Sequence, residues 1–423
     1  MILILIRHGA AQRQTEHGSD AERPLTDKGR ARFAQAAAGL SLLLPANVRI
    51  VSSSKLRAVQ TSEILAENMG EKAVEKNETL INGNLQLFLD IRQSPGIWVA
   101  AVGHEPFAGI WRAKISGTVK RPFGIGAAAI LDVERNGTGR LICDIGQGQA
   151  VRLAKENCSF PHEHLARFLH LRRIILSGNA VDEDIHQLRA NIRRVRVTLL
   201  LGSKYLPRKQ YANVTKCLKQ LLDATANSRE YAVLSQMLRM SGQNTCNLDK
   251  FLEEAQKNAT AGLISMLSSN DVYVAIAEAF GLLETIRKRK KAALPAIGHC
   301  RGLIRKIKRL IKEMDAGNQE TLHAIRVSIR KLCDAAIVFP QIRHAVGNNI
   351  IDKADIMQAI LGRWHDLYRS RLLLQEISAN KPGDEKREAE NAIIAITSAC
   401  MPGDIIKPLK KLRKKLHAAL ERQ

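Results

Sequence analysis

The sequence is poor in aromatic residues, in paired cysteines and in long apolar runs. Phe, Trp and Tyr make up 4% of its 423 residues. The seven cysteines are scattered without a CxxC pair, which argues against a zinc site and against a disulfide framework. The apolar start Ile2–Ile6 is too short for a signal peptide, and no run approaches the roughly 18 apolar residues of a membrane span. We therefore expect a cytoplasmic protein with no integral membrane segment, no metal and no cofactor.

Acidic residues are also outnumbered. The chain has 65 Lys and Arg against 41 Asp and Glu, a formal net charge of +24. Residues 1–150 contribute 18 basic and 14 acidic side chains, whereas residues 151–423 contribute 47 and 27. An excess concentrated in one part of the chain indicates a polyanionic partner there, which could be nucleic acid, an anionic membrane surface or inorganic polyphosphate.

The distribution of apolar residues divides the chain into two kinds of fold. Up to about residue 148, short strand patterns such as Ile2–Ile6 alternate with helical patterns, which predicts an α/β domain over 1–148. Gly and Gln residues then predict a linker over 149–162. From residue 163 onward only helical periodicity remains, so we predict an all-α domain over 163–423.

An internal repeat divides the predicted helical domain. The segment IHQLRANIRRVR carries His186, Arg189, Arg193 and Arg194, and LHAIRVSIRKLC carries His323, Arg326, Arg330 and Lys331, each 137 positions later. The repeat predicts two helical bundles, about 163–295 and 296–423, related by a pseudo-two-fold axis. The basic residues of each copy share one helix face, where like charges repel. The same unfavourable pattern in both copies indicates a ligand of opposite charge.

This doubled H-x-x-R-x-x-x-R-[RK] pattern resembles the CHAD domain, the conserved-histidine α-helical domain. The resemblance implies a basic channel between two bundles that binds inorganic polyphosphate. It assigns the ligand-binding role to His186, Arg189, Arg193, Arg194, Arg196, His323, Arg326, Arg330 and Lys331. Nucleic acid is less favoured, because single strands are usually bound by stacking aromatics and residues 151–423 contain only 11.

Three strand ends of the first domain carry candidate catalytic residues. Arg7 and His8 follow the first strand, Arg57 follows a later one in LRAVQTS, and His104 follows a third in VGHEP. Active sites of open α/β sheets gather at the carboxyl ends of the strands. Arginines offer paired donors to phosphate, and a neutral imidazole can attack phosphorus. The three segments therefore predict a phosphoryl-handling pocket.

Together with RPLTDKG at residues 23–29, these motifs resemble the histidine phosphatase superfamily, in particular its SixA-like branch. The resemblance implies a phosphoglycerate-mutase-like fold in which His8 accepts the phosphoryl group and Arg7, Arg57 and His104 hold it. Lys55 stands where the family usually has proline. Glu78 lies in the region where larger members of the superfamily have a general acid and is a candidate for that role, but the SixA-like branch has no obvious equivalent. The absence of an acid favours phosphohistidine or phosphoanhydride substrates, whose leaving groups need less proton assistance.

Three hypotheses follow for the whole chain. The leading one is a phosphohistidine-type phosphatase that works without metal and is joined to a polyphosphate-binding module, which could associate with polyphosphate granules. Its substrate would be a phosphorylated protein or a small phosphate compound. The alternative is a polyphosphate-binding protein whose phosphatase fold is degenerate or only senses phosphate. The third is a nucleic-acid-binding protein.

Overall fold

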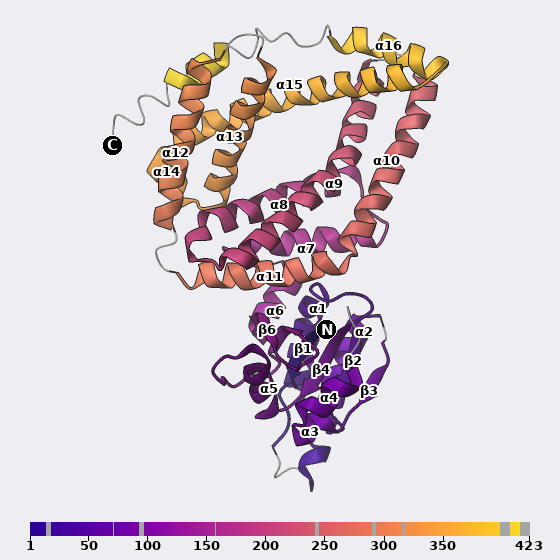
Figure 1. Ribbon diagram of the computed structural model, residues 1–423, viewed down its shortest axis with the longest axis vertical. Helices are drawn as coiled ribbons and strands as arrows, with labels where there is room; N and C mark the ends of the chain where they lie inside the picture. The colour runs from indigo at the N-terminus through magenta and orange to yellow at the C-terminus, as the bar shows by residue number, and fades with distance from the viewer. Residues whose placement is uncertain are drawn as a thin grey trace. The chain divides into compact units, whose positions relative to one another are not determined.

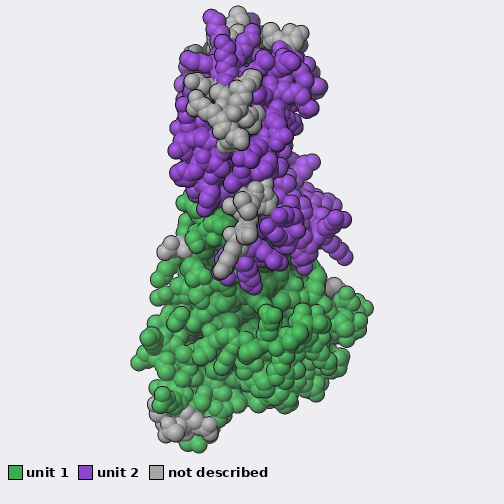
Figure 2. All heavy atoms as spheres, turned by 90° about the vertical axis from the view of Figure 1, so that its left-hand side faces the viewer, with its two compact units in different colours: residues 1–173, 268–284 green, residues 174–267, 285–423 purple. Residues whose placement is uncertain are grey.

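The computed structural model describes residues 1–13, 18–70, 72–92, 97–156, 158–241, 245–289, 293–314, 318–397 and 407–414. The chain forms two compact units, which Figure 2 distinguishes by colour. Unit 1 comprises Met1–Arg173 and Ser268–Glu284, and unit 2 comprises Ile174–Leu267 and Thr285–Gln423.

Unit 1 contains a six-stranded mixed sheet in the order β3-β2-β4-β1-β5-β6. The strands are β1 (Ile2–Arg7), β2 (Arg49–Ser52), β3 (Val74–Lys76), β4 (Trp98–Gly103), β5 (Ala128–Val133) and β6 (Gly139–Ile145). Strands β1 to β4 are parallel to one another, whereas β5 pairs antiparallel with both β1 and β6. The predicted α/β architecture is therefore confirmed.

Helices cover the sheet on both faces. They are α1 (Asp27–Ser41), α2 (Leu56–Asn68), α3 (Thr79–Asn82), α4 (Leu85–Arg92), α5 (Phe107–Ser116) and α6 (Gln147–Ala154). Leu3 and Leu5 of β1 pack in one apolar cluster with Phe88 of α4 and Trp111 of α5. The intervening Ile4 is completely buried as well, so β1 is covered on both sides, which explains its uninterrupted apolar sequence.

The register of the sheet brings three strand ends together. Arg7 at the end of β1 lies opposite Gly103 at the end of β4, and Ser52 at the end of β2 lies opposite Val102 of β4. The segments that follow β1, β2 and β4 therefore begin side by side at one edge (Figure 1).

The segment predicted as a linker, 149–162, begins inside helix α6. Gly146 precedes this helix and its N–H donates to the side chain of Gln149, so the Gly-Gln sequence starts a helix instead of a flexible connection. Ala150 of α6 packs closely on α1, where a Cβ atom at Gly39 would lie 1.8 Å from the Ala150 carbonyl oxygen. Only a glycine at position 39 permits this approach.

Unit 1 also includes most of helix α11 (Asn270–Arg287) and of helix α7 (Glu163–Leu176). The Trp98 indole N–H of β4 donates to the side chain of Asn270. Arg140 of β6 forms an ion pair at 2.5 Å with Glu278, whose side chain is only 3% exposed. Residues far along the chain thus complete the compact unit that contains the sheet.

Unit 2 is helical throughout its described residues, as predicted. Its helices include α8 (Asp182–Leu201), α9 (Arg208–Ser241), α10 (Cys246–Leu267), α12 (Ala293–Lys312), α13 (Gln319–Val338), α14 (Gln341–Val346), α15 (Asn348–Asn380) and α16 (Asp384–Thr397). Among the described residues, no helix has the length and apolarity needed to cross a membrane.

The sequence repeat corresponds to repeated helices in unit 2. Helices α8 and α13 each have 20 residues. A long helix comes after each of them (Figure 1), namely α9 with 34 residues and, beyond the short α14, α15 with 33. An apolar cluster from α9, α10, α15 and α16 joins the two copies, with Leu234, Leu238, Leu248, Leu252, Leu374 and Ile377 among its members. The pseudo-symmetric pair of bundles is confirmed.

Candidate active site and anion cavity

His8 is held as a neutral imidazole with one unprotonated ring nitrogen. Its Nδ1 lies 2.7 Å from the carbonyl oxygen of Gly9, which can only accept, so Nδ1 carries the proton. Nε2 then has the lone pair and accepts a hydrogen bond from Arg57 Nε at 3.2 Å. Burial, with the nearby guanidiniums of Arg57 and Arg7, lowers the pKa of His8 to about 4, although the bond to Gly9 opposes the shift. The ring is therefore ready to act as a nucleophile at neutral pH.

Arg57 is the buried centre of the site. It lies in the first turn of α2 and is 4% exposed. Besides Nε on His8, its Nη1 donates to the main-chain oxygen of Asp20 at 2.5 Å and its Nη2 to the Asp20 carboxylate at 3.0 Å. All three guanidinium nitrogens thus have partners close to the nucleophile.

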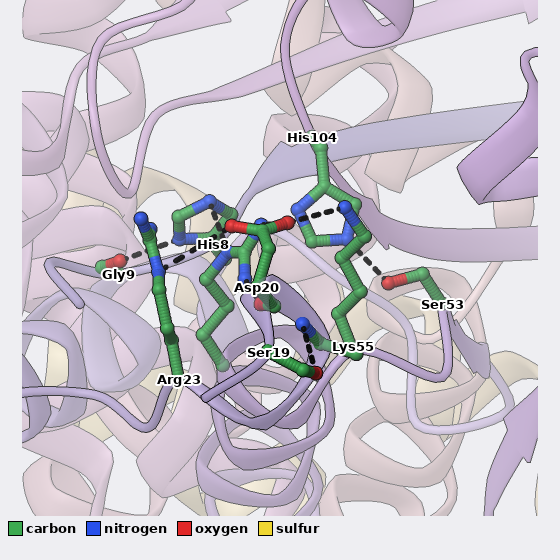
Figure 3. Close-up of polar contacts among 10 residues, drawn as sticks. His8, Gly9, Ser19, Asp20, Arg23, Ser53, Lys55 and His104 are labelled. Atoms are coloured by element: carbon green, nitrogen blue, oxygen red, sulfur yellow. Dashed lines mark hydrogen bonds and ion pairs between the residues drawn. The ribbon is translucent and has the colours of Figure 1, made fainter. Parts of the chain in front are cut away.

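His104 faces His8 from the end of β4, with 5.0 Å between the ring centroids. Its Nε2 lies 2.5 Å from the Ser53 hydroxyl. Its Nδ1 is buried without a hydrogen-bond partner and points toward His8 in Figure 3. Burial, followed by the charges of His8 and Arg57, lowers the pKa of His104 to about 3. Ser53, which the sequence did not single out, fixes this ring.

The remaining predicted catalytic residues differ in their placement. Arg7 directly precedes His8, and its Nη1 donates to the Phe123 carbonyl at 2.6 Å while its buried Nε has no hydrogen-bond partner. Glu78 is exposed at the start of α3, and its carboxylate forms no hydrogen bond or ion pair with any described residue. The structure therefore brings His8, Arg7, Arg57 and His104 together and leaves Glu78 apart.

Asp20 is the carboxylate that does reach the site, and no sequence pattern indicates it beyond its position just before the RPLTDKG motif. Its Oδ2 accepts from Lys55 Nζ at 2.6 Å and from Arg57, and its Oδ1 lies 3.5 Å from Arg23 Nε (Figure 3). The hydrogen bond from Lys55, with that from Arg57, holds the pKa of Asp20 well below its usual range. Asp20 is therefore an anion held among the cations of the pocket.

Unit 2 contains a cavity of about 390 Å³ between the two copies of the repeat. Six of the nine residues predicted to bind polyphosphate line it, namely His186, Arg189, Arg193, His323, Arg326 and Arg330. Helices α9 and α15 add matched pairs to the wall, Arg229 with His365 and Glu230 with Asp366. Arg194, Arg196 and Lys331 are not part of the lining.

The cavity concentrates positive charge away from water. Burial, together with neighbouring arginines, lowers the pKa of both Arg189 and Arg330 to about 10. His365, in the same wall, has its pKa lowered to about 3 by burial and by Arg326. Such mutual repulsion is a cost that a bound polyanion would relieve.

Sequence comparison gives these two sites a family context. A sequence model of the CHAD domain matches residues 162–375, which is half of the chain. The chain belongs to the CHAD domain family. Its N-terminal part, residues 3–91, matches the histidine phosphatase superfamily (branch 1). The architecture is therefore a histidine phosphatase domain followed by a CHAD domain.

Known proteins resemble each part separately. An uncharacterized protein from a Picosynechococcus species is 32% identical over 147 residues, which are 33% of this chain and 88% of that protein. The CHAD domain structure from the plant Ricinus communis covers 60% of this chain and 88% of its own, at 20% identity and a TM-score of 0.51. A structure of the protein histidine phosphatase SixA with tungstate covers 35% and 98%, at 23% identity and a TM-score of 0.31.

Within the CHAD domain, the cavity has an asymmetry that the repeated motif does not reveal. Val233 of α9 corresponds in the repeat to Arg369 of α15, and both line the cavity. Arg369 donates twice to the carboxylate of Glu230, at 3.1 and 2.9 Å. Asp334 lies 3.7 Å from both Arg193, which lines the cavity, and Arg194, which does not. Each wall contributes three arginines and one carboxylate to the lining, so the two walls carry the same formal charge but at different positions.

Proposed function

We propose that this chain is a phosphatase that works through a phosphorylated His8 and carries an inorganic-polyphosphate-binding module. The observation that carries the proposal is the pairing of His8 Nε2 with Arg57 Nε, because it presents a lone pair and a phosphate-binding cation in one place. The substrate class is a phosphohistidine or a phosphoanhydride, and no metal takes part in the proposed reaction.

The reaction follows from the positions of the side chains. His8 Nε2 attacks phosphorus, and the bond from phosphorus to the substrate's leaving group breaks, with the electron pair going to the leaving group. The proton stays on Nδ1, hydrogen-bonded to the Gly9 carbonyl, so the ring becomes a phosphorylated imidazolium. Arg57 and Arg7 neutralise the phosphoryl oxygens, and His104, oriented by Ser53, faces the same group. Water then attacks phosphorus, the P–N bond breaks, and phosphate leaves.

The polyphosphate part of the proposal is supported by the charge of the CHAD cavity. Five arginines other than Arg369 line it, and only Glu230 and Asp366 oppose them there. A chain of phosphates has about one charge per unit and no bases, so closely spaced guanidiniums are the chemistry that it needs. Of the aromatic side chains in unit 2, none lines the cavity.

Loss of the nucleophile tests the enzymatic claim. His8→Ala should lower turnover of a phosphohistidine protein and of p-nitrophenyl phosphate by about 10⁴-fold or more, and should abolish labelling of the protein by radioactive phosphoryl substrate. His344→Ala, at an exposed histidine of unit 2, is the matched control and should retain both. Full turnover by His8→Ala would exclude the mechanism.

One observation favours a second candidate, a phosphatase fold that only senses phosphate. The Asp20 carboxylate engages the arginine that a substrate would need. Phosphate release by the purified chain separates the two functions.

A competition experiment tests the ligand proposed for unit 2. Nucleic acid that displaces polyphosphate at equal charge concentration would overturn the choice of polyphosphate, and both polyanions must be compared at one salt concentration.

A further inference from the structure

The carboxylate of Asp20 marks a place for a second anion in the catalytic pocket. It lies between Lys55, Arg57 and Arg23, at 2.6, 3.0 and 3.5 Å. Its side chain is 37% exposed whereas that of Arg57 is 5% exposed, so the carboxylate lies on the solvent side of the buried arginine. An oxyanion from a ligand would find the same three cations there once Asp20 moved aside.

Lys55 and Arg23 exceed what one phosphoryl group requires. The transferred group would be held next to His8 by Arg57, Arg7 and His104. Among the described residues, Lys55 and Arg23 form no hydrogen bond or ion pair with His8 or His104, and both instead pair with Asp20. Four cations and a single carboxylate leave a net charge of about +3 in the pocket, more than a dianionic monoester neutralises.

The described residues around His8 also offer no proton donor for a basic leaving group. Asp20 is ionised by its cationic partners, and Glu78 has no contact with the site. Glu105 accepts a hydrogen bond from the Phe123 N–H at 2.7 Å and is engaged there. A leaving group that departs as a stable anion needs no proton, and a phosphate oxygen is such a group.

We propose that the pocket cleaves the terminal phosphoanhydride bond of an inorganic oligophosphate, with the penultimate phosphate bound by Lys55, Arg23 and Arg57 in place of the Asp20 carboxylate. This inference rests on the proposed phosphatase function and specifies its substrate. His8 Nε2 forms a bond to the terminal phosphorus, and the bridging oxygen leaves with the electron pair of the broken P–O bond. Water then attacks the phosphorus and the P–N bond breaks, which restores the neutral imidazole. The product is dihydrogen phosphate, which carries both protons of the water.

Tripolyphosphate and p-nitrophenyl phosphate, used with the full chain, distinguish the second subsite from the first. Lys55→Gln should lower kcat/KM for tripolyphosphate by about 10- to 100-fold, as expected for the loss of a charge-assisted hydrogen bond. It should change kcat/KM for p-nitrophenyl phosphate by less than about 3-fold, and Lys55→Arg should restore most of the loss. Lys114→Gln, at an exposed lysine of α5, is the control and should behave like the parent.

Asp20→Asn provides an independent measurement. Because the resident carboxylate competes for the same cations, its neutralisation should lower KM for tripolyphosphate. A fall in kcat without a fall in KM would instead identify Asp20 as a proton donor and overturn the inference. Repeating Lys55→Gln in an Arg330→Gln background weakens the contribution of the CHAD cavity. If Lys55→Gln then no longer affects tripolyphosphate more than p-nitrophenyl phosphate, the inference is also overturned.

The outcomes separate this inference from the function on which it rests. If p-nitrophenyl phosphate is hydrolysed in a His8-dependent manner and tripolyphosphate is not, the phosphatase stands and the oligophosphate assignment is wrong. If no substrate is hydrolysed in a His8-dependent manner, both are wrong. His8-dependent release of phosphate from tripolyphosphate that Lys55→Gln selectively impairs supports both.

Discussion

Arg57 donates a hydrogen bond from Nε to Nε2 of His8 across 3.2 Å. The cation that would bind the phosphoryl group therefore also keeps the attacking nitrogen unprotonated, because a protonated Nε2 could not accept this bond. The two residues are 49 positions apart in the chain and come together because β1 and β2 both flank β4 and end at the same edge of the sheet.

The pH dependence of catalysis should show this relationship. Burial and the charges of Arg57 and Arg7 place the pKa of His8 at about 4, below its ordinary value of 6.5. As the pH falls through about 4, Nε2 takes up a proton and loses its lone pair, so kcat/KM should fall about tenfold per pH unit. NMR titration of the His8 ring checks that the same group is responsible. An acid limb that begins near 6.5 would contradict this assignment.

Ser53 should act on catalysis through the orientation of His104. Ser53→Ala removes the hydroxyl that lies 2.5 Å from Nε2 and leaves a buried ring nitrogen without a partner. The expected loss is about 5- to 100-fold in kcat, from about 1–3 kcal/mol for an unsatisfied buried polar group. Ser53→Thr should retain part of the activity because it keeps the hydroxyl. Ser54→Ala, at the neighbouring exposed serine, should have no effect.

Arg330 should contribute to binding at the expense of stability. It lies in the cavity near Arg193 and Arg326, and their charges disfavour its own. Arg330→Gln should weaken polyphosphate binding by about 10- to 100-fold in calorimetric titration at fixed salt. The thermal midpoint of the unliganded chain should be unchanged or higher, since repulsion is removed. Arg387→Gln, with a side chain 79% exposed, is the control for both measurements.

The ion pair between Arg140 and Glu278 should stabilise unit 1. Arg140→Ala leaves a carboxylate that is 3% exposed without its cation, whereas Glu278→Gln removes the buried charge itself. Urea unfolding should therefore show a larger loss of stability for Arg140→Ala, of about 1–3 kcal/mol. Because Gln has nearly the size and shape of Glu, a larger loss for Glu278→Gln would show that the buried carboxylate is itself stabilising, and would contradict this prediction.

Much of the catalytic pocket could be predicted from the order of the motifs. A strand end is recognisable from its apolar run, and parallel neighbours bring such ends together, so His8, Arg57 and His104 could be placed in one site. The repeat likewise predicted six of the residues that line the cavity, because equal spacing on helices of equal length gives equal faces, but Arg194, Arg196 and Lys331 lie outside the lining.

Other features depend on tertiary contacts that no local pattern encodes. Asp20 reaches Lys55 and Arg57 across 35 and 37 positions of chain, so its role in the pocket could not be predicted. The segment around Gly146 has the composition of a linker, yet Gln149 closes the first turn of a helix there. Arg194 belongs to the repeated motif but does not line the cavity, and the spacing of the motif does not show this.

The contribution of Ser268–Glu284 to unit 1 affects the order in which the protein matures during synthesis. The sheet is complete at residue 145, but the partners of Trp98 and Arg140 lie on a helix that the ribosome has yet to make. At about 5–20 residues per second, the nascent catalytic half waits several seconds for Asn270 and Glu278, while much of the first helical bundle emerges in between. Unit 1 therefore becomes fully stable only after Ser268–Glu284 have been translated. The phosphatase fold can then mature only in a chain that already carries part of the helical domain.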